Sequence, residues 1–192
     1  MRIRLAVLFL GCAAVVSCDS LGSGEHVVAP SRPPNVVIIF ADDQGYADLG
    51  VYGAEGFETP TIDRMAAEGI TFTSFYVASP ACSPSRAALL TGSYPQRVSI
   101  PRVLYPQLNV GLHPDEVTIA DLLKPLGYST AIFGKWHLGH HPEHLPGAQG
   151  FDEYFGLPYS NDMTPDATKT PNPPARRHPP LPLIEGLVSV EL

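Results

Sequence analysis

The stretch "NVVIIFADDQG" (residues 35–45) decides the expected fold of this chain. Its first six residues are almost all apolar and largely β-branched, and they lie between "RPP" and a polar turn. A continuous run of this kind is typical of a strand buried on both faces of a parallel sheet. Asp42 and Asp43 follow directly, so we expect two carboxylates where that strand ends.

Strand-like and helix-like patterns alternate along the chain after this run. "TPTIDRMAAEG" (59–69) predicts a helix with Thr59 as N-cap, Pro60 at the first helical position and Gly69 just past the end. The further predicted elements are a strand at 70–77 ("ITFTSFYV"), a short helix beginning near Ser85, a helix capped by Thr118 with Asp121 and broken near Pro125, and a strand at 128–136 ("YSTAIFGKW"). This order predicts an α/β fold with a largely parallel sheet.

Composition excludes two classes of protein. The chain has 192 residues, 44% of them hydrophobic and 16% charged, which is too apolar for a disordered protein and enough for one sizeable core. The formal net charge is −7, with 12 Lys and Arg against 19 Asp and Glu. Nucleic acid is therefore not an expected partner, because no basic stripe is present to bind phosphates.

The N-terminal residues have the pattern of an export signal. Arg2 and Arg4 precede the apolar run "LAVLFLGCAAVV" (5–16), which is too short to span a bilayer comfortably. We expect residues 1–18 to be a signal peptide and residues 19–34 to be a linker. The protein is then exported, to the bacterial periplasm or to a membrane surface.

"VVSC" (15–18) resembles a relaxed bacterial lipobox, in which Cys18 becomes the lipidated first residue of the mature protein. The alternative is an ordinary cleaved signal in which this cysteine is a coincidence. A membrane is expected as a partner only through this lipid anchor.

Three polar segments follow predicted strands or precede predicted helices, at the edge where ligands bind in open α/β sheets. In the first, Asp42 and Asp43 can reach one ion only where the strand has ended and the chain turns, as Gly45 permits. Two hard carboxylates favour Ca²⁺ or Mg²⁺ over a soft metal. The alternative is a solvated turn.

The second segment, "GKWHLG" (134–139), places Lys135 and His137 two residues apart at a strand end, so that they project to the same side. A fixed cation beside a proton donor suits a tetrahedral anion and its leaving oxygen. The alternative is a surface lysine and a hydrogen-bonded histidine. His140, His141 and His144 follow, and we interpret them as a polar loop, with a zinc site as the minor alternative.

The third segment contains Cys82. Of three cysteines, Cys12 and Cys18 lie in the predicted signal, so Cys82 is the only interior thiol of the expected mature chain and has no disulfide partner within it. A lone cysteine is commonly a buried, inert apolar residue. Its neighbours here favour a reactive site instead.

"CSPSR" (82–86) followed by "AALLTGSYPQR" resembles the signature of the type I sulfatases, in which the cysteine of C-x-P-S-R becomes Cα-formylglycine. The strand and turn at 35–53, the segment at 59–76 and the segment at 118–139 are similar to that family in the same order, and "GFDEYFGLPYSNDM" (150–163) is similar to its arylsulfatase A-like branch. The resemblance runs from Asn35 to about Leu183. It implies an alkaline-phosphatase-like sandwich with a largely parallel central sheet, of which residues 35–192 are the N-terminal part.

The resemblance also implies roles for individual residues. Asp42, Asp43 and the modified Cys82 would bind the metal, with Ca²⁺ expected rather than Mg²⁺. Arg86 would hold and polarise the hydrated formylglycine. The remaining residues would contact the sulfate or line its pocket, with His137 also steadying the aldehyde hydrate: Lys135, His137 and Ser160.

The chemistry implied is hydrolysis of a sulfate ester, of an aryl alcohol or of a carbohydrate. A formylglycine-generating or sulfatase-maturing enzyme is the partner that would convert Cys82. The alternatives are a phosphate or phosphonate ester hydrolase of the same superfamily, and a non-catalytic lipoprotein that keeps the fold.

The C-terminal residues depart from a complete family pattern. Seven of the eighteen residues from Pro165 to Pro182 are proline, which indicates an extended loop, and "LIEGLVSVEL" (183–192) indicates the start of a strand pair. Further metal and sulfate ligands of the family have no counterpart in the sequence. We therefore expect these residues to be an inactive, truncated part of the catalytic domain.

Overall fold

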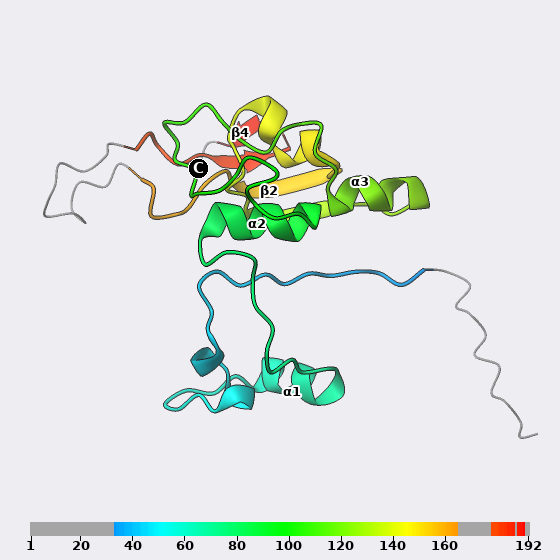
Figure 1. Ribbon diagram of the computed structural model, residues 1–192, viewed down its shortest axis with the longest axis vertical. Coiled ribbons are helices and arrows are strands. Elements are labelled where there is room, and N and C mark those ends of the chain that lie inside the picture. The colour runs from blue at the N-terminus through cyan, green and yellow to red at the C-terminus, as the bar shows by residue number, and fades with distance from the viewer. Residues whose placement is uncertain (1–32, 165–177, 187, 191–192) are drawn as a thin grey trace, which may run out of the picture. The chain divides into compact units, whose positions relative to one another are not determined.

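The computed structural model describes residues 33–164, 178–186 and 188–190 (Figure 1). The predicted signal peptide, Cys18 and most of the linker at 19–34 lie outside the described residues, as does most of the proline-rich loop at 165–182. The chain forms two units divided after Ala41. No helix among the described residues is long and apolar enough to cross a membrane.

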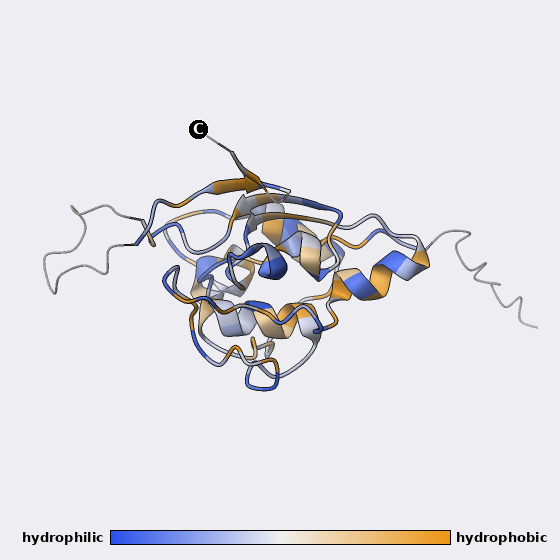
Figure 2. Ribbon diagram, turned by 90° about the horizontal axis from the view of Figure 1, so that it is seen from above, coloured by the Kyte–Doolittle hydropathy of each residue, from blue (hydrophilic) through white to orange (hydrophobic). Residues whose placement is uncertain are grey.

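The described residues form three α-helices, and two of them end where the sequence carries the signals for their ends. α1 (Pro60–Glu68) follows Thr59 and ends at Gly69, and α3 (Ile119–Leu123) begins with the predicted capping box. Figure 2 shows both hydrophilic and hydrophobic residues on the helices, and α1 has no buried residue. The other helical elements are α2 (Cys82–Thr91) and the 3₁₀ turns η1 (Tyr46–Asp48), η2 (Gly50–Tyr52), η3 (Lys124–Leu126), η4 (Pro142–His144) and η5 (Pro146–Gln149).

The described residues form one sheet of four strands in the order β1-β2-β3-β4. β1 (Ala131–Lys135) runs parallel to β2 (Glu153–Leu157), and β3 (Leu183–Glu185) and β4 (Val188–Val190) complete the sheet in antiparallel pairs. The expectation of a largely parallel sheet is thus met by one pairing of three. The predicted strand pair after residue 183 is confirmed as a hairpin that turns at Gly186.

One face of this sheet packs against the core. Ile132 pairs with Tyr154, and Ile184 lies on the same face, where these side chains join a buried cluster around Trp136 and Leu138. The rest of that cluster comes from α2, from the loop between α2 and α3, and from the segment between β1 and β2. These residues are Ala87, Val98, Ile100, Leu104, Leu112, Leu145 and, at the edge of the cluster, Leu90 and Phe151.

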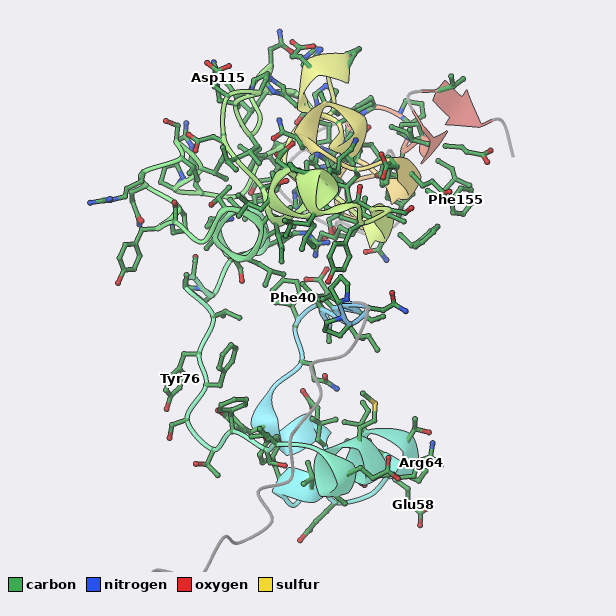
Figure 3. All side chains as sticks on the ribbon, turned by 90° about the vertical axis from the view of Figure 1, so that its right-hand side faces the viewer. Phe40, Glu58, Arg64, Tyr76, Asp115 and Phe155 are labelled. Atoms are coloured by element: carbon green, nitrogen blue, oxygen red, sulfur yellow. The ribbon has the colours of Figure 1, made fainter. Side chains whose placement is uncertain are left out.

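The opposite face of the sheet is bare in the described part of the chain. Phe133 and Phe155 are register partners on neighbouring strands, and they are 69% and 43% exposed. Figure 3 labels Phe155, whose side chain projects outward from β2. The expectation that the sheet is buried on both faces therefore does not hold for these strands.

Two predicted strands are not formed. Residues 35–40 and 70–77 have no strand structure, and their apolar side chains are exposed, among them Val37 at 82% and Ile70 at 83%. A strand exists only when a neighbour satisfies its backbone N–H and C=O groups, and β1 pairs only with β2 among the described strands. The apolar pattern predicted a strand in each segment, but no described strand pairs with either one.

Candidate functional site

The first residue of α2 is Cys82, three positions before the predicted start of this helix. Ala81 is its extended N-cap residue, and the Ala81 carbonyl accepts a hydrogen bond from the Ser85 N–H at 3.0 Å. Pro84 fits the first turn because no N–H is needed there. Ser83 and Pro84 are fully buried, whereas Cys82 is a half-buried free thiol. The helix therefore presents residue 82 at its accessible end.

Arg86 lies one turn further along the same helix and reaches the end of β1. Its Nε donates to the Trp136 carbonyl at 2.8 Å, and its Nη2 donates to the Lys135 carbonyl. Burial lowers the pKa of the Arg86 guanidinium, and the nearby Asp42 and Cys82 side chains oppose that shift. The CSPSR helix and the GKWHLG segment are thus joined by the half-buried guanidinium of Arg86.

The chain leaves β1 through His137, which takes a left-handed backbone conformation with φ of 62°. The flanking contacts hold this turn: the Trp136 N–H donates to the Leu157 carbonyl at 2.8 Å, and the His137 N–H donates to the Pro158 carbonyl at 3.1 Å. Trp136 is fully buried beneath it. Simple strand alternation therefore does not set the direction of His137, contrary to the reasoning from sequence.

The His137 ring is 1% exposed, and its Nε2 lies 2.8 Å from the Leu104 carbonyl. A carbonyl oxygen can only accept, so Nε2 carries the proton and Nδ1 is the acceptor of a neutral ring. Burial is the main cause that lowers the pKa of His137 to about 4, and Lys135 and Arg86 add to it. Nδ1 has no hydrogen-bond partner among the described residues.

Lys135 is the last residue of β1, and its side chain is 13% exposed. Its Nζ contacts Asp42 Oδ2 at 2.6 Å. Burial lowers the pKa of both His137 and Arg86, and the negative charge of Asp42 opposes that shift in each. The structure thus brings four predicted site residues, Asp42, Arg86, Lys135 and His137, into one electrostatic cluster beside Cys82.

The turn at the carboxylate pair is made by Asp43, with φ of 59°, and not by Gly45, whose φ is −101°. Asp is among the few side chains that tolerate this region. Two adjacent carboxylates supply the hard oxygen ligands that Ca²⁺ or Mg²⁺ prefers, so their chemistry fits the expected ion. No group of three His, Cys, Asp or Glu side chains in the described ranges is arranged to hold a metal, and the set Asp42, Asp43 and Cys82 stays a prediction.

Ser160 follows β2 in a buried turn, and its role in the sulfate pocket stays a prediction. Its contacts bring in a residue that sequence reasoning did not select. Its side chain hydrogen-bonds to Asp162, which is the main cause that lowers the pKa of that carboxyl. Lys135 and His137 contribute to the same shift. Asp162 lies in the stretch "PYSNDM" (158–163), two residues after Ser160. A carboxylate this close to a predicted pocket serine is the sequence feature by which Asp162 could have been selected.

The histidines after His137 lie close to one another, with tilted or edge-to-face rings. The rings of His140 and His141 are 4.5 Å apart, and Nδ1 of His144 is 2.9 Å from the Leu112 carbonyl. His140 also contacts Tyr159 edge to face. These contacts are consistent with the interpretation of a polar loop.

Comparison with known proteins agrees with this geometry. The sequence model of the sulfatase family matches residues 34–188. The chain is 52% identical to human arylsulfatase A over 151 residues, which is 77% of this chain and 30% of that protein. It is 48% identical to N-acetylgalactosamine-6-sulfatase of Sus scrofa over 163 residues, which is 81% of this chain and 31% of that protein.

A solved structure has the same fold over most of this chain. The crystal structure of Ps i-CgsB superposes with a TM-score of 0.71 at 38% identity, over 83% of this chain and 37% of that one. The structure of the same protein in complex with k-i-k-neocarrahexaose gives a TM-score of 0.61 at 42% identity, over 67% of this chain and 29% of that one.

The chain spans about 30% of the length of the curated relatives it matches. Within that span, the family match covers the carboxylate turn, the CSPSR helix and the Lys135–His137 segment, which the structure joins through Arg86. On these grounds the chain belongs to the sulfatase family, with the sulfatase fold.

Proposed function

We propose that these residues are the N-terminal part of a formylglycine-dependent enzyme that hydrolyses sulfate esters. The observation that carries the proposal is the bridge made by Arg86, which ties the helix beginning at Cys82 to the carbonyls of Lys135 and Trp136. That bridge holds a nucleophile position, a fixed cation and a neutral buried histidine in one site.

Residue 82 is the proposed nucleophile. Once converted to hydrated formylglycine, it supplies one hydroxyl that attacks sulfur and displaces the alcohol of the ester. The second hydroxyl then loses its proton and expels sulfate by C–O cleavage, which restores the aldehyde. Its half-exposed place at the start of α2 leaves it open to the substrate. Arg86, four residues on, would polarise it through its positive charge.

The surrounding charged residues would hold the anion. Lys135, which contacts Asp42 in this structure, is the proposed contact to a sulfuryl oxygen, and Ser160 lines the same pocket. His137 presents Nδ1 as the acceptor for a hydroxyl proton, because its Nε2–H is committed to Leu104. A divalent cation bound by Asp42 and Asp43, expected to be Ca²⁺, would add positive charge opposite the developing sulfuryl oxygens.

We further propose a sulfated carbohydrate as the substrate class, in preference to a simple aryl sulfate. Two relatives support this: one is named N-acetylgalactosamine-6-sulfatase, and Ps i-CgsB has been solved with k-i-k-neocarrahexaose. Export to the periplasm or membrane surface, with lipid on Cys18, is part of the same proposal, since polymeric glycans are met outside the cytoplasm.

The test uses the full-length protein, expressed with a formylglycine-generating system. The tryptic peptide that ends at Arg86 should lose about 18 Da, the difference between thiol and aldehyde. The converted protein should hydrolyse a sulfate ester of a phenol much faster than the phosphate ester of the same phenol. A preference for phosphate would favour the alternative phosphatase activity, and an unmodified, inactive protein from the native host would favour the non-catalytic alternative.

A further inference from the structure

Two hydrogen bonds connect the CSPSR helix to the His137 ring through a single residue of the loop between α2 and α3. The Ser83 Oγ accepts the Leu104 N–H at 3.1 Å, and the Leu104 carbonyl accepts the His137 Nε2–H at 2.8 Å. Ser83 is 0% exposed, Leu104 6% and His137 1%. Leu104 is therefore fixed on both sides of its Cα within a dry environment.

The loop that carries Leu104 has no ladder of its own to hold it. No helix or strand lies between Thr91 and Ile119, and all of these residues are described. The Leu104 N–H donates to the Ser83 Oγ, and the loop that carries it pairs with no strand of the described sheet. Loss of that acceptor would leave a buried donor unsatisfied, and the loop would shift to satisfy it.

A shift of Leu104 would move its carbonyl oxygen, which accepts the hydrogen bond from the His137 ring and so determines the ring tautomer. The left-handed backbone at His137 fixes where the ring begins, but only the Leu104 carbonyl determines which ring nitrogen holds the proton. Without that carbonyl, the neutral ring can hold its proton on either nitrogen. The free acceptor at Nδ1 would then be lost in part of the molecules.

We propose that Ser83 is a positioning residue for His137, acting through Leu104 to fix the Nε2–H tautomer and leave Nδ1 as the acceptor in the active site. This rests on the proposed function for its catalytic consequence, although the tautomer itself does not depend on turnover. Ser83 occupies the x position of the C-x-P-S-R pattern, so the same short helix would supply the nucleophile and orient the group that receives its proton.

The experiment compares Ser83→Ala with Ser83→Thr in the full-length protein. Ser93→Ala is the matched control, because it removes a hydroxyl just past the other end of α2, where the Ser93 Oγ donates to the Thr91 carbonyl at 3.5 Å. Rates are divided by the fraction of residue 82 converted to formylglycine, measured on the tryptic peptide, because Ser83 lies within the sequence that a maturing enzyme must read. Histidine labelled with ¹⁵N reports the tautomer, with the His137 signal assigned from its absence in His137→Gln.

We expect Ser83→Ala to lower kcat per converted enzyme by roughly ten- to a hundredfold with little change in KM, the size of effect that misplacement of a reacting group produces. Its His137 ring should show both tautomers, whereas wild type, Ser83→Thr and Ser93→Ala should show only the Nε2–H form. If Ser83→Ala does not fold, Ser83→Cys replaces it, since sulfur keeps the size but is a weak acceptor.

Two results would overturn the inference. The first is a Ser83→Ala enzyme with wild-type kcat per converted molecule and a single Nε2–H tautomer. The second is a wild-type ring protonated at Nδ1. A wild-type protein that hydrolyses no sulfate ester but shows the expected tautomers would defeat the proposed function and leave the Ser83 contact supported.

Discussion

Two regions of this chain have similarly apolar sequences and bury them to different extents. Between residues 82 and 163, Trp136 and Leu138 are fully buried. Between residues 35 and 77, Val37 and Ile70 are more than four-fifths exposed, and Tyr76, labelled in Figure 3, points into open space at 78% exposure. We name residues 82–163 the packed region and residues 35–77 the exposed region. An apolar sequence therefore forms a core only where other elements pack against it.

The largest expected effect comes from testing the exposed region directly. Expressed alone, the 192 residues should be poorly soluble, melt with little cooperativity and hydrolyse no aryl sulfate, even with formylglycine at residue 82. Unpaired β-branched segments with exposed apolar side chains favour aggregation. The full-length protein expressed in the same way is the control, and a soluble, cooperatively melting, active 192-residue chain would refute the expectation that it is truncated.

The second prediction concerns the nucleophile at the edge of the packed region. Cys82→Ala should lower sulfatase activity of the full-length protein by roughly 10⁴-fold or more, because the residue that forms the covalent bond is lost. Stability to urea should change by less than about 1 kcal/mol, since the thiol is half-buried and makes no disulfide. Retained turnover in this variant would exclude residue 82 as the nucleophile.

Sequence patterns predicted helix ends in both regions, and a strand of the packed region, where the signal was local. The caps at Thr118 and Gly69 gave the ends of their helices, and β1 formed inside the predicted range. The start of α2 was misplaced by three residues because its N-cap is Ala81, which has no capping side chain.

The candidate site was predicted less completely, because several of its contacts are not local. Arg86 and Lys135 follow from short motifs, but the Leu104 carbonyl that holds His137 lies in a loop with no pattern of its own. The turn was expected at Gly45, because glycine is the usual residue in a left-handed conformation, whereas the residue with that conformation is Asp43. Residues whose role depends on a distant backbone atom carry no sequence signal of their own.

The third prediction is a pH dependence of stability that originates in the packed region. Burial lowers the pKa of His137 from 6.5 to about 4, so the unfolded chain binds more protons between these values. The neutral His137 therefore contributes ~3 kcal/mol to the free energy of unfolding. This contribution is complete above about pH 7 and is lost as the pH falls from 6.5 to 4.

Urea denaturation of the full-length protein at several pH values would measure this loss. His137→Gln should flatten the slope between pH 6.5 and 4, whereas His113→Gln, at an exposed position, should leave it unchanged. The hydrogen bond from Lys124 lowers the pKa of Asp152 to about 2. The stability that depends on the Asp152 carboxylate is therefore lost between pH 3.8 and 2, below the range in which His137 titrates. An unchanged slope in His137→Gln would place the titrating group elsewhere.

The fourth prediction returns to the carboxylate turn beside the exposed region. Asp43→Asn keeps the size and the tolerance of a positive φ but removes one negative charge. Ca²⁺ affinity of the full-length protein, measured by calorimetry, should fall roughly ten- to a hundredfold, or ~1.4 to ~2.8 kcal/mol. Asp115→Asn, at a side chain 92% exposed, is the control, and equal affinities in the two variants would remove Asp43 from the ligand set.

The smallest predicted effect tests whether local signals really hold the packed region together. Thr118 is fully buried, its Oγ1 accepts the Asp121 N–H at 3.3 Å, and it also lies 2.8 Å from the Gln149 carbonyl. Thr118→Val keeps the shape but loses the cap, which should cost about 1 to 2 kcal/mol in urea denaturation of the full-length protein. Thr118→Ser keeps the hydroxyl and should lose less than half of that amount. A clear loss in Thr118→Ser with none in Thr118→Val would mean that the methyl group, through packing, and not the cap, stabilises the start of α3. The contrast between the two regions would then rest on packing alone.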